Sequence, residues 1–355
     1  MRRAHTTKAA ALLLAGSLAL AACASDEEGG SSGSGGSAPA GDDVKVGVAY
    51  DTGGRGDKSF NDSAIAGVEA AVEDLGLSME DDVEELSPNA DGSNREELLT
   101  QLAEAGYNPV IAVGFSYGDI IADVAGAYPD TQFAIVDTSV EELGADNLTG
   151  LIFAEEEGSF LAGAAAALKS QTGHVGFVGG MQSTLIQKFE AGYAAGAKEV
   201  NPQIVVDVQY LSPEGDPSGF GDPEGGKIAA QGMYQAGADI VFHAAGGSGS
   251  GVFEAAVEAG KRAIGVDSDQ YLSAPPDQQA VIMTSMLKRV DLAVQGFVND
   301  MASGDLEGGS DIVNDLSTDG IRLSDSGGFI TDIQDQIDDF RQQIIDGDIE
   351  VPTTP

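Results

Sequence analysis

From residue 44 onward, short apolar runs alternate with longer stretches in which apolar residues recur every three or four positions. The runs at 110–113 and 133–136 are continuously apolar, which is typical of parallel strands covered on both faces. Ile65, Val68 and Val72 share one face of a predicted helix. In this first part we expect strands at 44–49, 109–113 and 132–136, helices at 60–75, 94–105 and 117–127, and a segment at 148–153 that leads into an alanine-rich helix at 156–168.

The same alternation of predicted strands and helices begins again near residue 174. There the pattern predicts strands at 174–178, 204–210, 239–242 and 263–266, and helices at 184–200, 224–236 and 251–259. Two successive sets of alternating elements, with a break near 140–150, indicate an α/β protein with two doubly wound, Rossmann-like lobes.

The C-terminal part holds one more predicted strand at 281–285, a helix at 288–301 and a last helix at 332–346. These elements are too few for a third domain, so we infer that crossovers of the chain share them between the lobes and form a hinge. We therefore expect lobe I at 44–147, completed by about 270–303, and lobe II at 148–269, completed by about 304–350.

The first 22 residues have the pattern of an export signal. Arg2, Arg3 and Lys8 precede or begin an apolar run that is too short to span a bilayer comfortably, and small residues come before Cys23. The segment 20–23 resembles the lipobox of bacterial lipoproteins, in which the cysteine becomes the acylated N-terminus. We predict a signal peptide at 1–22 and a protein anchored to the cell membrane outside the cytoplasm through lipid on Cys23. A secreted protein with an incidental cysteine is the alternative.

Residues 23–43 predict a flexible tether behind the acylated cysteine. The segment consists mainly of Gly, Ser, Asp, Glu, Ala and Pro, and such a composition cannot bury a hydrophobic core. A coil of this length reaches on the order of 25 Å.

The charge and the single cysteine exclude several classes of protein. The chain has 58 Asp and Glu against 17 Lys and Arg, a net charge of -41, so its surface repels nucleic acid. One cysteine forms no intramolecular disulfide, and the histidines lack the ligand spacing that zinc requires. We read His174 as a surface residue and His243 as a packed polar residue.

Ligands of open α/β sheets bind beyond the carboxyl ends of the strands. Candidate binding residues are therefore sought in the loops that follow the predicted strands. These loops are 50–61, 114–117, 137–139, 179–181, 215–223, 245–251 and 267–269, together with Lys288 after the last strand.

These loops favour binding over catalysis. The glycine-rich segment 247–251 is not the dinucleotide fingerprint, and Asp267 with Asp269 supplies too few ligands for calcium. No nucleophile stands beside an activating base, so we expect no catalytic residue, no metal and no cofactor. Phe60 and Phe220 offer stacking surfaces to a flat ligand. Phe60 has a purely structural alternative as a residue that packs its helix onto the sheet.

Four motifs in order carry a resemblance to a known family. They are 57–61 (DKSFN), 173–181 (GHVGFVGGM), 244–253 (AAGGSGSGVF) and 265–270 (GVDSDQ). From about residue 44 to residue 352 the sequence resembles the basic membrane protein family, whose members are substrate-binding lipoproteins of ABC importers of the purine-nucleoside-receptor type. The resemblance implies a type I periplasmic-binding-protein fold that closes two lobes around a nucleoside.

By position, the resemblance assigns eight residues to the ligand site. Two rings would sandwich the base, an amide and a carboxylate would bond its polar edge, and the remaining groups would hold the ribose. In that order they are Phe60 and Phe220; Asn61 and Asp137; Asp267, Lys288, Asp51 and the backbone at Gly246.

Two departures from the family pattern affect this assignment. Residues 212–219 have the character of an insertion ahead of Phe220, which leaves Tyr210 as an alternative second aromatic. The loop after Met181 lacks a proline that is common there, which affects the rim of the site.

The resemblance implies a monomeric binding protein that delivers a nucleoside to a membrane permease. The permease would need a separate ATPase subunit, because the chain has no nucleotide-hydrolysis motif. The negative charge favours a neutral nucleoside over a nucleotide. Alternatives of other classes are a sugar or autoinducer as ligand, a tethered sensor for a membrane receptor, and a nucleoside-processing enzyme.

Overall fold

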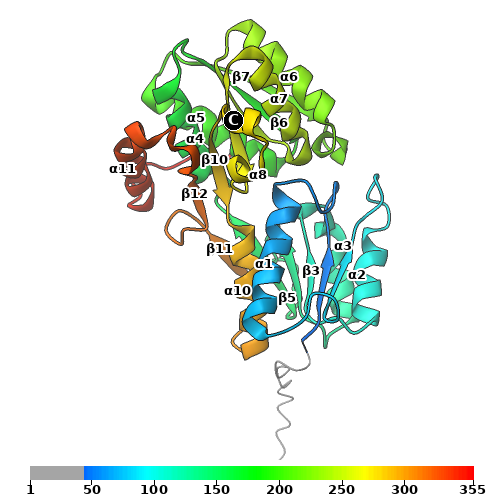
Figure 1. The fold of residues 1–355 in the computed structure, drawn as a ribbon. Coiled ribbons are helices and arrows are strands. Elements are labelled where there is room, and N and C mark those ends of the chain that lie inside the picture. The colour runs from blue at the N-terminus through cyan, green and yellow to red at the C-terminus, as the bar shows by residue number, and fades with distance from the viewer. Residues whose placement is uncertain (1–43) are drawn as a thin grey trace, which may run out of the picture. The chain divides into compact units, whose positions relative to one another are not determined.

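The computed structural model describes residues 44–355, which form two α/β lobes, each built on a six-stranded sheet (Figure 1). The prediction of two doubly wound lobes is confirmed. The predicted signal peptide, Cys23 and the tether lie outside the described residues. None of the helices within 44–355 is long and apolar enough to cross a bilayer.

Lobe I contains an entirely parallel sheet with strand order β11-β5-β4-β3-β1-β2. Its strands are β1 (Val46–Ala49), β2 (Val83–Leu86), β3 (Val110–Ala112), β4 (Phe133–Val136), β5 (Leu148–Phe153) and β11 (Asp311–Asn314). Its helices are α1 (Phe60–Leu75), α2 (Arg95–Glu104), α3 (Gly118–Ala127) and α10 (Val290–Ser303), with the 3-10 turn η2 (Phe115–Tyr117). Helices α1 and α10 lie side by side, with Gly67 against the backbone of Asp291 (Figure 1).

Lobe II has strand order β12-β10-β9-β8-β6-β7, in which only β12 is antiparallel to its neighbour. Its strands are β6 (His174–Met181), β7 (Val205–Ser212), β8 (Ile240–Ala244), β9 (Arg262–Asp267), β10 (Ile282–Lys288) and β12 (Ile321–Leu323). Its helices are α4 (Glu155–Lys169), α5 (Thr184–Val200), α6 (Pro223–Ala236), α7 (Gly249–Ala259), α8 (Gln270–Ser273), α9 (Pro276–Gln279) and α11 (Gln334–Ile345). Short 3-10 turns are η3 (Pro217–Phe220), η4 (Gly246–Ser248), η5 (Ser326–Gly328) and η6 (Thr331–Ile333).

The chain passes between the lobes in three places, and this corrects the predicted boundaries. The passages follow β5, β10 and β11. The segment 148–153, expected to open lobe II, is strand β5 of lobe I, because it pairs with β4. Within the tail, β10 belongs to lobe II although 270–303 was assigned to lobe I, and β11 belongs to lobe I although 304–350 was assigned to lobe II.

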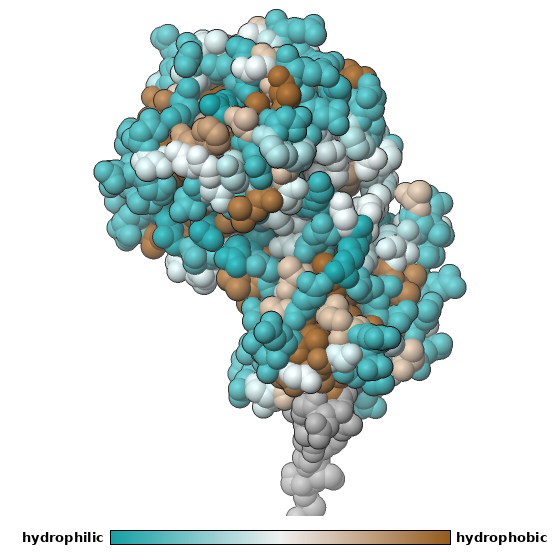
Figure 2. All heavy atoms as spheres, viewed as in Figure 1, coloured by the Kyte–Doolittle hydropathy of each residue, from teal (hydrophilic) through white to brown (hydrophobic). Residues whose placement is uncertain are grey.

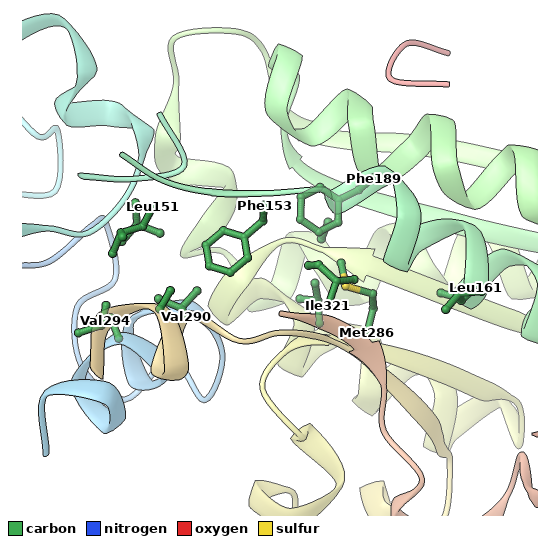
Figure 3. Close-up of a cluster of buried hydrophobic side chains, with 14 of the residues drawn as sticks. Leu151, Phe153, Leu161, Phe189, Met286, Val290, Val294 and Ile321 are labelled. Atoms are coloured by element: carbon green, nitrogen blue, oxygen red, sulfur yellow. The ribbon is translucent and has the colours of Figure 1, made fainter. Parts of the chain in front are cut away.

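The largest apolar core follows these crossing segments. Figure 3 shows Leu151 and Phe153 of β5, Met286 of β10 and Ile321 of β12, with Val290 and Val294 of α10 close by. All of these side chains belong to one cluster of buried residues that extends through both lobes. The crossing strands are therefore part of the core and not exposed linkers.

The surface is mainly hydrophilic, with apolar residues in small separate groups on the face shown in Figure 2. Scattered single apolar residues are normal on soluble proteins. Within residues 44–355, the large apolar side chains that are exposed are Leu143, Val205, Val208, Ile228, Leu272, Leu292, Val313 and Ile345.

Helices α4 and α5 pack closely because glycines line their contact. A methyl group at Gly192 would overlap the backbone of Glu156, and one at Gly196 would overlap the backbone of Phe160. Backbone cannot move aside as a flexible side chain does, so a larger residue must push the helices apart.

We therefore expect Gly196→Ala to lower the free energy of unfolding by about 1–3 kcal/mol, measured by denaturant titration. Gly232→Ala in α6 is the matched control, since no atom lies within 4 Å of a methyl group built there. Alanine should stabilise that exposed helical position by roughly 0.5–1 kcal/mol. Equal effects at the two sites would contradict the close packing of α4 on α5.

Candidate functional site

A cleft that is partly open to solvent is lined by residues from both lobes. It lies beyond the carboxyl ends of the strands, as expected for doubly wound sheets. The structure brings together at this cleft all eight residues that the sequence predicted. They are Asp51, Phe60, Asn61, Asp137, Phe220, Gly246, Asp267 and Lys288.

Two aspartates at the cleft occupy equivalent places in the two lobes. Asp137 follows β4 of lobe I and Asp267 ends β9 of lobe II. Both have a left-handed backbone, with φ of 70° and 63°. Aspartate and asparagine tolerate this conformation better than other non-glycine residues, although it still costs free energy. Both turns therefore bring a carboxylate to the cleft in a conformation that few residue types adopt.

The ammonium group of Lys288, at the end of β10, is buried among carboxylates and aromatic rings. Its Nζ lies 2.5 Å from Asp137 Oδ1 and 3.3 Å from Glu155 Oε1. It also lies 5.0 Å from the ring centroid of Phe60, 5.1 Å from that of Phe153 and 5.7 Å from that of Phe189. Such distances allow cation–π attraction. Burial alone would lower the pKa of Lys288, but the neighbouring carboxylates outweigh it and raise that pKa, so the group stays charged.

Asp137 and Asp267 are harder to ionise than ordinary aspartates. Burial raises the pKa of Asp137 to about 7, against the opposing effect of Lys288. Burial also raises the pKa of Asp267 to about 6, although Lys288 and the Ser59 hydroxyl group favour its charged form. Desolvation disfavours a charge, and one ammonium cannot neutralise several acids. Both aspartates therefore titrate closer to neutral pH than an exposed aspartate does.

The side chain of Asn61 is fixed by its surroundings. Its Oδ1 accepts a hydrogen bond from the backbone N–H of Asp51 at 3.0 Å, and its Nδ2 donates to Asp57 Oδ2 at 3.0 Å. The opposite amide orientation would place donor against donor and acceptor against acceptor. One N–H of Nδ2 is left for another partner. Asn61 therefore offers a hydrogen-bond donor at the cleft.

Of the two candidates for the second aromatic residue, Phe220 lines the cleft. Its ring lies against Gly180, where a methyl group would overlap it. Tyr210 is engaged elsewhere, because its hydroxyl group donates to Glu190 at 2.5 Å and its ring packs on Phe177. The extra segment before Phe220 folds into η3, whose first turn is capped by the side chain of Asp216.

Several residues of the cleft were not predicted as site residues. Phe115 lies in a loop that was considered but received no role, and Asp57 lies in a quoted motif. Leu185 and Phe189 line the cleft from helix α5, so a search confined to strand ends misses them. The same search misses Glu155 at the start of α4, which does not line the cleft but contacts Lys288. Their only sequence signal is their place in the first two turns of helices that follow strands.

The two histidines outside the N-terminal segment have structural environments. His243 is fully buried and its Nε2 lies 3.0 Å from Gln270 Oε1. His174 begins β6 and pairs with Asp207 at 2.8 Å. Among residues 44–355 no group of three or more His, Cys, Asp or Glu side chains is arranged to hold a metal ion.

Two lobes with a cleft between them are the fold of type I periplasmic solute-binding proteins. A solute-binding protein of an ABC transporter from Aeropyrum pernix K1 superposes with a TM-score of 0.76 at 27% identity, covering 87% of this chain and 93% of the other. One from Conexibacter woesei has a TM-score of 0.68 at 24% identity over 87% of this chain, which shows the fold alone.

The sequence comparison identifies the family. Residues 44–355 match the Bmp family, described as "ABC transporter substrate-binding protein PnrA-like". The "ABC transporter nucleoside-binding protein BmpA" of Lactococcus lactis is 33% identical, over 88% of this chain and 90% of that protein. The "CD4+ T-cell-stimulating antigen" of Listeria monocytogenes is 35% identical, over 88% of this chain and 89% of that protein. The chain belongs to the Bmp family and is a substrate-binding protein of an ABC transporter, not an enzyme.

Because the pKa of Asp137 is raised, we expect the free energy of unfolding to depend on pH in a specific way. Because the folded-state pKa of about 7 exceeds the ordinary value of 3.8, the fold favours the protonated carboxyl group. The resulting stabilisation is complete below pH 3.8 and is lost as the pH rises through 7. Asp137→Asn removes this titration and keeps a residue that tolerates a left-handed backbone.

We expect the difference in unfolding free energy, Asp137→Asn minus wild type, to rise between pH 5 and pH 8 by on the order of 2 kcal/mol. The measurement is denaturant unfolding at both pH values. Asp130→Asn, at an exposed position of lobe I, should show the same difference at both. A pH-independent difference for Asp137→Asn would contradict the shifted ionisation.

Proposed function

We propose that this substrate-binding protein binds a nucleoside, with a purine as the preferred base, and delivers it to an ABC permease. The observation that carries this proposal is the combination at one cleft of Phe60, Phe220 and the oriented amide of Asn61. The two rings come from different lobes and offer flat apolar surfaces to a base. The printed name of the Lactococcus lactis relative, a nucleoside-binding protein, supports the same ligand class.

The hydrogen-bonding groups suit the polar edge of a purine. Asn61 supplies a donor, and the carboxylate of Asp137 supplies an acceptor when it is ionised. Adenine and hypoxanthine both carry an acceptor next to a donor on one edge. We propose that these two side chains contact that edge between the two rings.

The remaining polar groups suit a ribose. Asp267, Lys288 and Asp51 line the same cleft, and the backbone at Gly246 adjoins it. Hydrogen bonds between hydroxyl groups and charged side chains contribute about 1.5–3 kcal/mol each. We propose that Asp267 and Lys288 hold the sugar hydroxyl groups, with Asp51 and Gly246 in supporting contacts.

The charge at the cleft favours an uncharged ligand. Four aspartates line it, namely Asp51, Asp57, Asp137 and Asp267, and Lys288 is the single lysine among its lining residues in the described chain. A phosphate group would add negative charge to this cluster, which disfavours its binding. We therefore propose that nucleosides bind more tightly than nucleotides.

The N-terminal sequence supports a protein held at the outer side of the cell membrane. The export-signal pattern ends at Cys23, where acylation would attach the chain to lipid. The segment 24–43 would then connect the anchor to the two lobes. Ligand contacts from both lobes would favour a closed form of the protein. The permease would recognise this closed form, and a separate ATPase subunit would power transport of the ligand.

We expect titration calorimetry to detect micromolar or tighter binding of adenosine, inosine or guanosine to protein unfolded and refolded to remove carried-over ligand. Ribose, free adenine and AMP should bind at least about tenfold more weakly, because each lacks part of the contacts or adds charge. AMP binding equal to adenosine binding would contradict a site for uncharged nucleosides. If the protein binds ribose or another sugar but no nucleoside, the ligand is a sugar and the proposed ligand class is wrong.

Two variants test the roles of the site residues. Phe60→Ala should weaken nucleoside binding by about 5- to 150-fold, since base stacking contributes about 1–3 kcal/mol. Asp267→Asn keeps a residue suited to a left-handed backbone and should weaken binding about tenfold or more. Phe329→Ala is the control, because that ring stacks on Arg262 in lobe II and lines a different pocket. Equal losses in Phe60→Ala and Phe329→Ala would contradict a stacking role for Phe60.

A further inference from the structure

Two of the sequence motifs meet each other, and the proposed ligand site uses only part of them. The loop before α1 contributes Lys58 and Ser59 from lobe I. From lobe II, the turn after β9 contributes Ser268, and the start of α8 contributes Gln270. None of these four side chains is among the residues that line the cleft. Their contacts join the two lobes directly.

Several hydrogen bonds cross between the lobes at this contact. Gln270 Nε2 donates to the carbonyl oxygen of Lys58 at 3.1 Å, and Ser268 Oγ donates to the carbonyl oxygen of Ser59 at 2.9 Å. Ser59 Oγ in turn donates to Asp267 Oδ2 at 2.5 Å. Lys58 has a left-handed backbone with φ of 54°, which is uncommon for lysine and marks a constrained position.

The amide group of Gln270 is oriented by its own lobe. Its Oε1 accepts from the backbone N–H of Val266 at 2.9 Å and lies 3.0 Å from His243 Nε2. Burial lowers the pKa of His243 to about 4, so the ring is neutral at pH 7 and can donate from Nε2. Because two donors hold Gln270 Oε1, the Nε2 group of Gln270 must face Lys58 of the other lobe. Gln270 is almost fully buried, with 3% of its surface exposed.

We propose that Gln270 is a positioning residue that fastens the lobes together and holds Asp267 in place for the ligand. Val266, whose N–H the side chain of Gln270 binds, directly precedes Asp267. The Asp267 carboxylate in turn binds Ser59 of lobe I and lines the cleft. Loosening this contact therefore shifts the lobes toward the open arrangement and misplaces one proposed ligand group. A ligand that prefers the closed arrangement then binds more weakly.

Gln270→Glu is the sharpest test, because it keeps the acceptor for Val266 and His243 but sets a carboxylate oxygen against the Lys58 carbonyl group. Gln279→Glu is the matched control, since Gln279 Nε2 donates to the carbonyl oxygen of Tyr271 at 2.9 Å within lobe II. Ser268→Ala is a milder second variant, which removes one interlobe hydrogen bond and tests the proposal should Gln270→Glu fail to fold.

The first measurement needs no ligand. In the full chain with Cys23→Ser, spin labels at Glu96→Cys in α2 and Gln235→Cys in α6 report the distance between the lobes by pulsed electron resonance. Both positions are exposed. We expect Gln270→Glu, and to a smaller extent Ser268→Ala, to lengthen or broaden this distance distribution, and Gln279→Glu to leave it unchanged. Unchanged distributions in both test variants would overturn the proposal.

The second measurement rests on the proposed function. By calorimetry we expect Gln270→Glu to weaken binding of adenosine or inosine about tenfold or more, while Gln279→Glu stays within twofold of wild type. Equal affinities in all three proteins would overturn a positioning role for Gln270. If wild-type protein binds no nucleoside, the proposed ligand is wrong, and the interlobe distances alone decide the role of Gln270.

Discussion

The arrangement of the cleft depends on the ion pairs of the buried Lys288 ammonium group. Lys288 is the last residue of β10, one of the strands after which the chain passes between the lobes. Its partners come from both sides of that passage, with Asp137 in lobe I and Glu155 at the start of α4 in lobe II. Removing one partner of a buried ion pair typically costs about 3–5 kcal/mol, because the other charge stays buried and unpaired. The crossing strands, the two lobes and the bottom of the cleft therefore constrain each other.

The same constraint shapes what the cleft can bind. Asp137 and Asp267 are held in left-handed turns beside this lysine, with pKa values raised to about 7 and about 6. Buried carboxyl groups beside one ammonium group disfavour the added negative charge of a phosphate, but they can form hydrogen bonds with a neutral ligand. The rings of Phe60 and Phe189 face the lysine, and Phe60 also lines the cleft. The charged cluster and the aromatic surface thus belong to one assembly.

Much of this arrangement could be predicted from the sequence, because strand ends of doubly wound sheets converge on one edge. That rule, together with the family resemblance, located Asp51, Asp137, Asp267 and Lys288 at one cleft. It missed Phe189 and Glu155, since these residues reach the site from helices, where an apolar or acidic side chain has no distinctive pattern. Edge strand β2 was also missed, because its sequence VEEL is short and half polar. The boundary between the lobes was misplaced at β5, because an apolar strand pattern does not tell which sheet the strand joins.

The central claim is that the cleft takes an uncharged nucleoside, and native mass spectrometry in competition tests it most directly. Refolded protein is incubated with equal concentrations of adenosine, inosine, AMP, ribose and glucose. Our account predicts one bound nucleoside per chain, with little or no AMP or sugar. A bound sugar, AMP in preference to adenosine, or protein without any bound ligand would contradict it.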